Sequence, residues 1–473
     1  MTSTPTIKNL LKLGLLSFLI LQACSFEPDL GKKISIAYPD HYHYDSSSSL
    51  PKLNAWWHYF HDPRLNKLIA SLLQKNFDLK KASYTLLQFK KKLDVTGSTL
   101  YPQFNLQAQV QREGKYVPYM PNQKKYLVQN NYSVFLMASY ELDLFRKLSD
   151  QKKAAFQQIL ENQYDVQTLR QSIICSFVST YLQLSLLDYK LKVQSKIICL
   201  EQSNLKYLLK SYEQGNVDYS QIIQKKITLA ELKNSFKELQ HNLTSTQYQL
   251  CTFLNQYPHP ISFTLWEKLR QIKLTIKPGL PSSLLKSRPD ILAKEKKLKQ
   301  LALEAKIKRK ARFPQITLTG QTGYTSNKLK QLFTPTNTLF NLAAGLVQPL
   351  FEAGKLKREE EIAVLEYKKA EIDYAKTLLQ AFKEVEVCLD LSHSLKAQLA
   401  QLKANLDLQE KNLLLTQYQY NKGNASYVDL NQAKISLLKT KLNLEQTRLN
   451  YFINQINLIK ALGGAWVKGQ IYQ

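Results

Sequence analysis

Glycine and proline are scarce in this chain of 473 residues, which contains 14 glycines and 16 prolines. In residues 122–257 the only glycine or proline is Gly215, and in residues 355–462 it is Gly423. Because proline breaks helices and glycine weakens them, their absence predicts two long helices, each followed by one turn and a shorter return helix. The expected helices are residues 142–214, 218–255, 355–422 and 426–462.

Long apolar runs and enzyme motifs are also missing. After residue 23 no segment approaches the roughly 18 uninterrupted apolar residues of a membrane-spanning helix, which excludes a bundle of membrane helices. The sequence has no G-x-x-x-x-G-K-[ST], G-x-G-x-x-G, H-E-x-x-H or G-x-S-x-G motif. We therefore expect no enzyme, no use of ATP and no cofactor. The histidine pairs at 41/43 and 58/61 lack the further ligands of a metal site, so none is expected.

The first 24 residues have the pattern of an export signal. Lys8 and Lys12 precede a nine-residue, largely apolar run at residues 13–21, which is too short to span a bilayer. Cys24 follows a small residue and resembles the acceptor of a bacterial lipoprotein signal. This resemblance predicts a cleaved leader, acyl chains on Cys24 and, from the Ser25 that follows, sorting to the outer membrane. An ordinary cleaved signal with an incidental cysteine is the alternative.

The other four cysteines show no pairing pattern. Cys175 and Cys199 lie 24 residues apart in one expected helix, a separation of about 36 Å that no disulfide can bridge. Nothing favours a bond between Cys251 and Cys388. We predict that all four are buried, unpaired and hydrophobic in character.

The two halves of the chain repeat each other at an offset of 208 residues. The matching positions are Tyr212, Gly215, Asn216, Tyr219, Gln224, Lys226, Ile227 and Leu229 in the first half, and Tyr420, Gly423, Asn424, Tyr427, Gln432, Lys434, Ile435 and Leu437 in the second. The repeat therefore predicts the same order of elements in each half: a helix, a strand pair, a long helix, a tight turn and a return helix.

Short segments of alternating polarity precede each long helix. Apolar and polar residues alternate in residues 104–111 and 316–321, and partner strands are expected at about 132–141 and 340–350. Segments of about ten residues with one apolar face are typical of membrane β-barrel strands. A strand of a soluble sheet is the alternative for any one of them, but four in an exported chain favour the barrel.

Four strands are too few to close a barrel. Membrane barrels have at least about eight strands, and an open edge would leave unpaired backbone groups in hydrocarbon. We therefore expect an α+β membrane protein that forms a homotrimer. Its 12-stranded β-barrel, with four strands per chain, would be continuous with an α-helical barrel about 100 Å long. This architecture indicates conduction.

Five segments, which together cover nearly the whole chain after the leader, match one known family in their order. They are Trp56–Leu65, Tyr140–Phe145, Leu280–Ile291 (with its Arg288-Pro289-Asp290), Gln348–Leu356 and Ala461–Trp466. They resemble the TolC-like outer-membrane efflux proteins, in the lipoprotein branch similar to OprM and NodT. The resemblance implies the same trimeric architecture, with a mixed equatorial belt between two efflux repeats.

The resemblance also implies a function. The chain would be the outer-membrane duct of a tripartite efflux pump that passes drugs or other small toxic compounds from the periplasm to the exterior. Its partners would be a periplasmic adaptor (membrane fusion) protein and a proton-driven inner-membrane transporter. The outer-membrane duct of a type I protein secretion system shares the architecture and stays an alternative, as does a non-conducting coiled-coil lipoprotein spacer.

Particular residues correspond to the periplasmic end of such a duct. The turns Gly215-Asn216-Val217 and Gly423-Asn424-Ala425 match tips that contact the adaptor, and glycine adopts the positive φ that a tight reversal needs. Tyr420 and Asp429 match gate positions, with Asp218 as a further candidate.

The gate pattern is incomplete, however. Ala425 replaces an arginine of the family pattern, and Gln432 and Gln221 replace aspartates, so much of the expected salt-bridge lock is absent. Three copies of Asp429 around a narrow axis would still form a negative ring that favours cations.

Basic residues outnumber acidic ones by 28. A nucleic-acid role would need clustered base-stacking aromatics and a cytosolic address, so export argues against it. The excess charge is expected to contact anionic outer-membrane lipid or to make the lumen favour anions.

These features give the expected domain boundaries. They are residues 1–23 (lipoprotein signal peptide), 24–61 (lipid-anchored tether), 62–257 (first efflux repeat), 258–284 (equatorial linker), 285–462 (second efflux repeat) and 463–473 (C-terminal tail).

Overall fold

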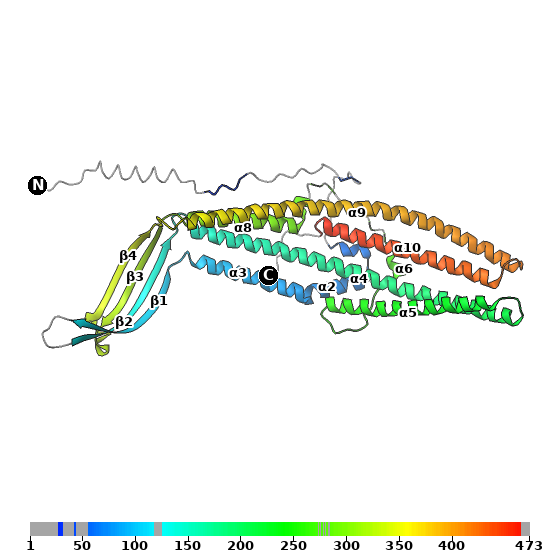
Figure 1. Cartoon of the computed structure of the whole chain (residues 1–473), viewed down its shortest axis with the longest axis horizontal. Coiled ribbons are helices and arrows are strands. Elements are labelled where there is room, and N and C mark those ends of the chain that lie inside the picture. Colours follow the sequence, from blue (N-terminus) through cyan, green and yellow to red (C-terminus); the bar gives the residue numbers. More distant parts are fainter. Residues whose placement is uncertain are drawn as a thin grey trace. The chain divides into compact units, whose positions relative to one another are not determined.

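The computed structural model describes residues 27–31, 42–43, 55–117, 125–272, 274, 276–277, 279, 281 and 284–464 (Figure 1). The signal peptide, Cys24 and residues 465–473 lie outside the described residues. The chain divides into two compact units. The first comprises Met1–Ser35, Thr85–Asn162 and Ala293–Tyr374, and the second comprises Ile36–Tyr84, Gln163–Leu292 and Ala375–Gln473.

The first unit contains one antiparallel sheet of four strands in the order β1-β2-β3-β4 (Figure 1). The strands are β1 (Gln103–Val117), β2 (Lys125–Leu142), β3 (Gln315–Ser326) and β4 (Thr338–Val347). The four predicted strands and the two predicted pairs are therefore confirmed. Pairing of β2 with β3 joins the two repeats into one sheet, which leaves β1 and β4 at its edges.

The strand register gives this sheet one mainly apolar face and one mainly polar face, because directly paired residues project to the same side. The apolar face carries Phe104, Leu106, Ala108, Val110, Val134, Leu136, Ala138, Leu318, Phe340, Leu342 and Leu346. The polar face carries Asn105, Gln107, Gln109, Gln111, Asn131, Ser133, Ser139, Thr317, Thr319, Gln321, Thr325 and Asn341, with Phe135, Met137, Leu339, Ala343 and Val347 among the apolar exceptions. Leu106 and Leu342 are 74% and 82% exposed in the single chain, so the apolar face lacks a covering layer.

All four strands join helices at the same end of the sheet (Figure 1). Two helices, α3 (Phe77–Ser98) and α8 (Pro289–Lys310), end shortly before β1 and β3. The other two, α4 (Lys147–Glu213) and α9 (Lys355–Asn421), begin shortly after β2 and β4. None of the helices that the structure describes is long and apolar enough to cross a membrane.

Helix α4 begins five residues later than the predicted residue 142. Asp143 accounts for the difference, because its carboxylate accepts hydrogen bonds from the backbone amides of Leu148 (2.9 Å) and Ser149 (2.8 Å). These amides belong to the first turn and have no partner within the helix. A left-handed residue, Arg146 (φ 58°), connects the strand to the helix.

The two long hairpins have the predicted plan. Helices α4 and α9 each span 67 residues and extend through both units, while α5 (Tyr219–Phe253) and α10 (Tyr427–Ala461) each span 35 residues in the second unit. At a rise of 1.5 Å per residue, each long helix is about 100 Å long. The absence of proline and glycine therefore predicted both helices to within a few residues, except at the start of α4.

Short elements and large apolar side chains fill the middle of the second unit. The elements are η1 (Trp56–Phe60), α2 (Pro63–Lys75), α6 (Trp266–Leu269) and α7 (Leu284–Ser287). The largest fully buried side chains include Trp266, Tyr181, Phe60, Phe177 and Leu65. This packing fixes the linker between the repeats against the long helices.

The cysteine prediction is confirmed in part. All four described cysteines are free, and Cys175, Cys251 and Cys388 are buried, but Cys199 is exposed. The prediction that Cys199 is buried was wrong, because this residue lies outside the stripe of α4 that packs against other helices. Burial raises the pKa of Cys175 to about 12 and that of Cys388 to about 11, which keeps both thiols protonated.

Candidate functional site

The two helical reversals of the second unit have the same backbone geometry. Gly215 and Gly423 have φ values of 73° and 81°, in the left-handed region that glycine adopts without steric cost. The amide of each glycine bonds the carbonyl three residues before it, and the next amide bonds the carbonyl five residues before it. The four bonds are Gly215 to Tyr212 (2.9 Å), Asn216 to Ser211 (2.9 Å), Gly423 to Tyr420 (3.0 Å) and Asn424 to Gln419 (2.9 Å). Both turns are therefore Schellman caps, equivalent at the predicted offset.

The helices that follow these turns begin differently. Ser426 and Asp429 form a capping box at α10, in which Asp429 accepts hydrogen bonds from the backbone amide (2.9 Å) and hydroxyl (2.7 Å) of Ser426. Asp218 is the N-cap residue of α5, equivalent to Ser426, but its side chain accepts no capping hydrogen bond. The hydrogen bonds from Ser426 lower the pKa of Asp429, so its carboxylate stays ionised at neutral pH.

The structure does not bring the three predicted gate residues into contact with one another. The carboxylate of Asp429 is bonded to Ser426, and the ring of Tyr420 lies 6.2 Å from that of Tyr427. Among the described residues, no hydrogen bond or ion pair links Asp429, Asp218 and Tyr420. Within one chain, Asp429 acts as a helix cap, and a gate would have to arise between chains.

A buried polar network lies one to four turns from the tips, and the sequence did not predict it. Asn431 of α10 donates to Asn204 of α4 (2.7 Å), and Asn204 donates to Glu201 (3.3 Å). Lys225 of α5 forms a salt bridge to Glu201 (3.0 Å). Glu201, Asn204 and Asn431 are all at most 5% exposed. The network therefore ties the first helical hairpin to α10, and we call it the tip network.

The spacing of residues along α4 was a signal for the tip network. Its buried positions near this end include 193, 197, 201, 204 and 208, at intervals of three and four residues that mark one helix face. Val, Ile and Leu occupy the outer positions of this stripe, and Glu and Asn occupy the central two. A carboxylate and an amide at core positions require partners, since unpaired buried polar groups are costly.

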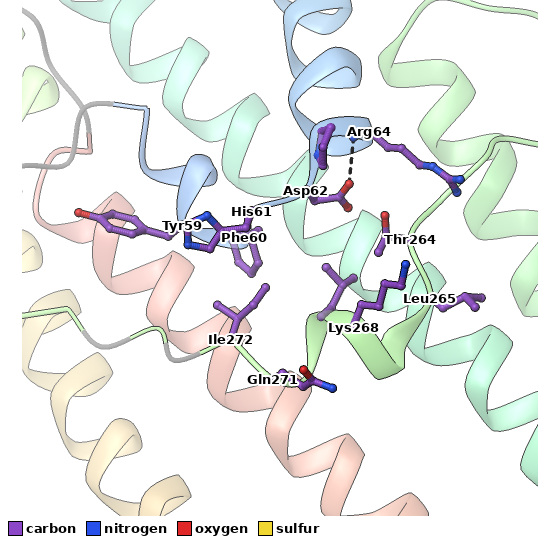
Figure 2. Close-up of a pocket in the computed structure, with 12 residues that line it drawn as sticks. Tyr59, Phe60, His61, Asp62, Arg64, Thr264, Leu265, Lys268, Gln271 and Ile272 are labelled. Carbon is purple, nitrogen blue, oxygen red and sulfur yellow. Dashed lines mark hydrogen bonds between the residues drawn. The ribbon is translucent and has the colours of Figure 1, made fainter.

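A cavity of the second unit has a volume of about 840 Å³ and lies between η1, α2 and α6 (Figure 2). Asp62 is its only carboxylate, and both of its oxygens are used by the fold. One accepts from the amide of Arg64 (2.9 Å), and the other accepts from the hydroxyl of Tyr181 (2.7 Å), which in turn bonds the amide of Thr264. The predicted Trp56–Leu65 segment thus anchors the linker to α4 rather than presenting a reactive group.

Arg288 of the Arg-Pro-Asp segment forms hydrogen bonds to several elements of the fold. It is 7% exposed and makes a two-pronged contact with Asp290 (3.0 and 2.6 Å). It also donates to Glu384 of α9 (2.8 Å) and to the carbonyl of Ala461 at the end of α10 (3.0 Å). Burial alone would lower its pKa, but Asp290 and Glu384 hold the pKa above its ordinary value. Arg288 therefore joins three helices of the second repeat.

Residues 68–256 and 280–464 match the family described as outer membrane efflux protein. The chain belongs to this family. The two matched segments coincide with the two halves that repeat each other, and they include both tips and all four strands.

Similar efflux proteins cover almost the whole chain. The probable outer membrane lipoprotein SilC of Salmonella typhimurium is 25% identical over 97% of this chain and 100% of its own length. The toluene efflux pump outer membrane protein TtgF of Pseudomonas putida is 27% identical over 90% and 88%. The solved CmeC outer membrane channel of Campylobacter jejuni superposes with a TM-score of 0.83, at 22% identity over 95% and 96%.

These matches confirm the predicted family, the fold class and the outer-membrane location. The efflux protein described here has the fold of outer-membrane channels, with four strands and two long helical hairpins per chain. Family membership makes it an outer-membrane efflux protein, and the solved CmeC protein, whose fold it shares, is described as an outer membrane channel.

Proposed function

We propose that this protein is the outer-membrane duct of a tripartite efflux pump and that it works as a homotrimer. One observation carries the proposal: the chain forms a four-stranded sheet with an uncovered apolar face and two unpaired edges. Three chains would pair β1 of one with β4 of the next and close twelve strands around the polar face. The long helices would continue the passage into the periplasm, and acyl chains on Cys24 would anchor each chain.

The proposed partners follow from the tips and from the relatives. The exposed turns at Gly215-Asn216-Val217 and Gly423-Asn424-Ala425 would contact a periplasmic adaptor, which links the duct to a proton-driven inner-membrane transporter. Relatives named for pyoverdine export and toluene efflux support small compounds as the cargo. They favour this cargo over the proteins that a type I secretion duct would carry. The boundaries 62–257 and 285–462 are proposed for the two efflux repeats.

Purification from outer membranes tests the proposal. We expect a heat-modifiable band of about three chains on gels run without boiling, and discrete conductance steps in planar bilayers. A crosslinker at residue 216 or 424 should capture an adaptor from cells that also express the neighbouring transporter genes. A monomer without conductance would refute the duct, and capture of a peptidase-linked ATPase would instead favour protein secretion.

Asp429→Ala tests the proposed gate of Asp429, Tyr420 and Asp218. If three Asp429 carboxylates form a ring, the substitution should raise the open probability and reduce cation selectivity in bilayers, because the negative ring is removed. It should also lower the free energy of unfolding by about 0.3–1 kcal/mol, because Asp429 is an ionised residue in the first turn of α10 and one half of its capping box. The cap is retained above the ordinary carboxyl pKa and lost only as pH falls through the lowered one.

Ser426→Ala is the matched control, because it breaks the other half of the same capping box and keeps the Asp429 carboxylate. Equal changes in both variants would mean that the cap alone affects opening. Unchanged opening and selectivity in Asp429→Ala would show that Asp429 is not a gate residue.

A further inference from the structure

We infer that the junction between the helices and the sheet is a binding surface for the anionic phosphate headgroups of phospholipids. The inference rests on the proposed function, in which the sheet lies in the outer membrane and the helices lie in the periplasm. All residues concerned belong to the first unit. The surface would contact the periplasmic leaflet, where phospholipids rather than lipopolysaccharide are expected.

The junction is strongly basic. Segments 90–94, 141–153, 304–312 and 352–361, which flank the helical ends of the four strands, contain fifteen lysines and arginines against nine aspartates and glutamates. Six of these basic side chains are exposed and form no salt bridge among the described residues. They are Lys90, Lys92, Arg146, Lys152, Lys355 and Lys357, and we call them the basic collar.

Two members of the basic collar lie at the amino end of a helix, where positive charge is unfavourable. Lys355 and Lys357 lie in the first turn of α9, which contains no acidic residue. The amino end of a helix carries a partial positive charge, so a base there is unfavourable unless an anion is nearby. Glu359, one turn further along α9, interacts electrostatically with Lys355 and offsets only part of this positive charge. A phosphate would be attracted by the lysines together with the backbone amides of Leu356 and Lys357, since the amides of Lys355 and Arg358 already bond the carbonyls of Glu352 and Gly354.

Exposed apolar side chains lie beside the basic collar. Leu350 and Phe351, just before Lys355, are 92% and 89% exposed, and Leu144, just before Arg146, is 63% exposed. Apolar or aromatic groups next to basic groups are typical of the membrane interface, where the first enter the acyl region and the second meet headgroups.

The distribution of charged residues along the strands agrees with a membrane interface at the junction. Residues 103–111, 126–140, 315–327 and 338–351 contain no Asp, Glu, Lys or Arg. The shortest of these segments spans roughly 30 Å at 3.3 Å per residue, and less along the membrane normal when the strand tilts. A transmembrane barrel has an apolar band about 25 Å tall. Charged residues of both signs, beginning with Glu141, Arg312 and Glu352, therefore start where the uncharged band ends beside β2, β3 and β4, and Arg146, Lys355 and Lys357 of the basic collar follow within a few residues.

The test compares trimers in detergent with added phosphatidylglycerol or phosphatidylcholine. We expect phosphatidylglycerol, but not phosphatidylcholine, to raise the temperature at which the trimer dissociates on gels by several degrees, and 0.5 M salt to abolish this rise. The triple variant Arg146→Gln, Lys355→Gln, Lys357→Gln should lose most of the rise. Removing bases from a helix amino end should not weaken the helix, so the loss would report lipid binding.

The matched control removes the same charge elsewhere on α9 through Lys396→Gln, Lys403→Gln and Lys411→Gln, all at exposed positions. It should keep the full phosphatidylglycerol effect. An equal effect in the collar variant and the wild type, or a salt-independent effect in the wild type, would overturn the inference while leaving the duct intact. Absence of any trimer would overturn the proposed function, and the collar with it.

Discussion

Arg288→Ala is expected to lower the free energy of unfolding by about 2–4 kcal/mol, because it removes a buried cation and leaves two partly exposed carboxylates and a backbone carbonyl without their donor. The side chain is 7% exposed and bonds Asp290, Glu384 and the carbonyl of Ala461. The midpoint of thermal loss of helical circular dichroism should fall by roughly 2–4 °C, because the entropy of unfolding of a chain of this length is about 1 kcal/mol/K. The heat-modifiable trimer should become scarce in outer membranes, since α8, α9 and α10 lose a common attachment.

Arg288→Lys distinguishes charge from geometry. Lysine keeps the positive charge but cannot contact Asp290 with two parallel hydrogen bonds and reach Glu384 as well. We expect it to recover less than half of the lost stability. Full recovery by lysine would show that charge alone matters, and an unchanged melting midpoint in Arg288→Ala would refute the structural role.

Lys225→Ala should loosen the tips of the hairpins and destabilise the chain by about 2–4 kcal/mol. It removes the cation that neutralises Glu201, which is 5% exposed and part of the tip network. Hydrogen exchange in residues 201–213 and 427–435 should accelerate more than in the rest of α4 and α10. If the tips close the duct, the variant should also open more often in planar bilayers.

Lys226→Ala is the control for this prediction, because Lys226 is an exposed neighbour without an ion pair among the described residues. It should change stability by no more than about 0.5 kcal/mol. The double variant Glu201→Leu, Lys225→Leu should recover much of the lost stability, since apolar pairs replace buried ion pairs well. A Lys225→Ala protein with unchanged exchange at the tips would contradict the role of the network.

Much of the fold could be predicted because it depends on local rules. Gly215 and Gly423 are the only glycines in residues 122–257 and 355–462, and glycine adopts a left-handed turn without steric cost, so they locate both reversals. Alternating polarity located the strands, because side chains of a strand alternate between its faces. The late start of α4 was missed, since the capping role of Asp143 depends on where its carboxylate points.

The interactions between helices were less accessible from sequence. Asp429 could be matched to a gate position, yet in this chain its carboxylate is bonded to Ser426. The tip network joins Asn204 to Asn431 across 227 residues, and no local pattern reveals which helix faces meet. Arg288 was noted as part of a family segment, but its contacts with Glu384 and Ala461 depend on packing.

The open edges of β1 and β4 have a consequence for biogenesis. A newly exported chain would expose the unpaired backbone groups of both edge strands and a large apolar surface to the aqueous periplasm. Both features promote aggregation with other chains. Its lifetime as a solitary species must therefore be short or protected by chaperones. Assembly would be a third-order event in chain concentration, so modest drops in expression would deplete the finished complex disproportionately.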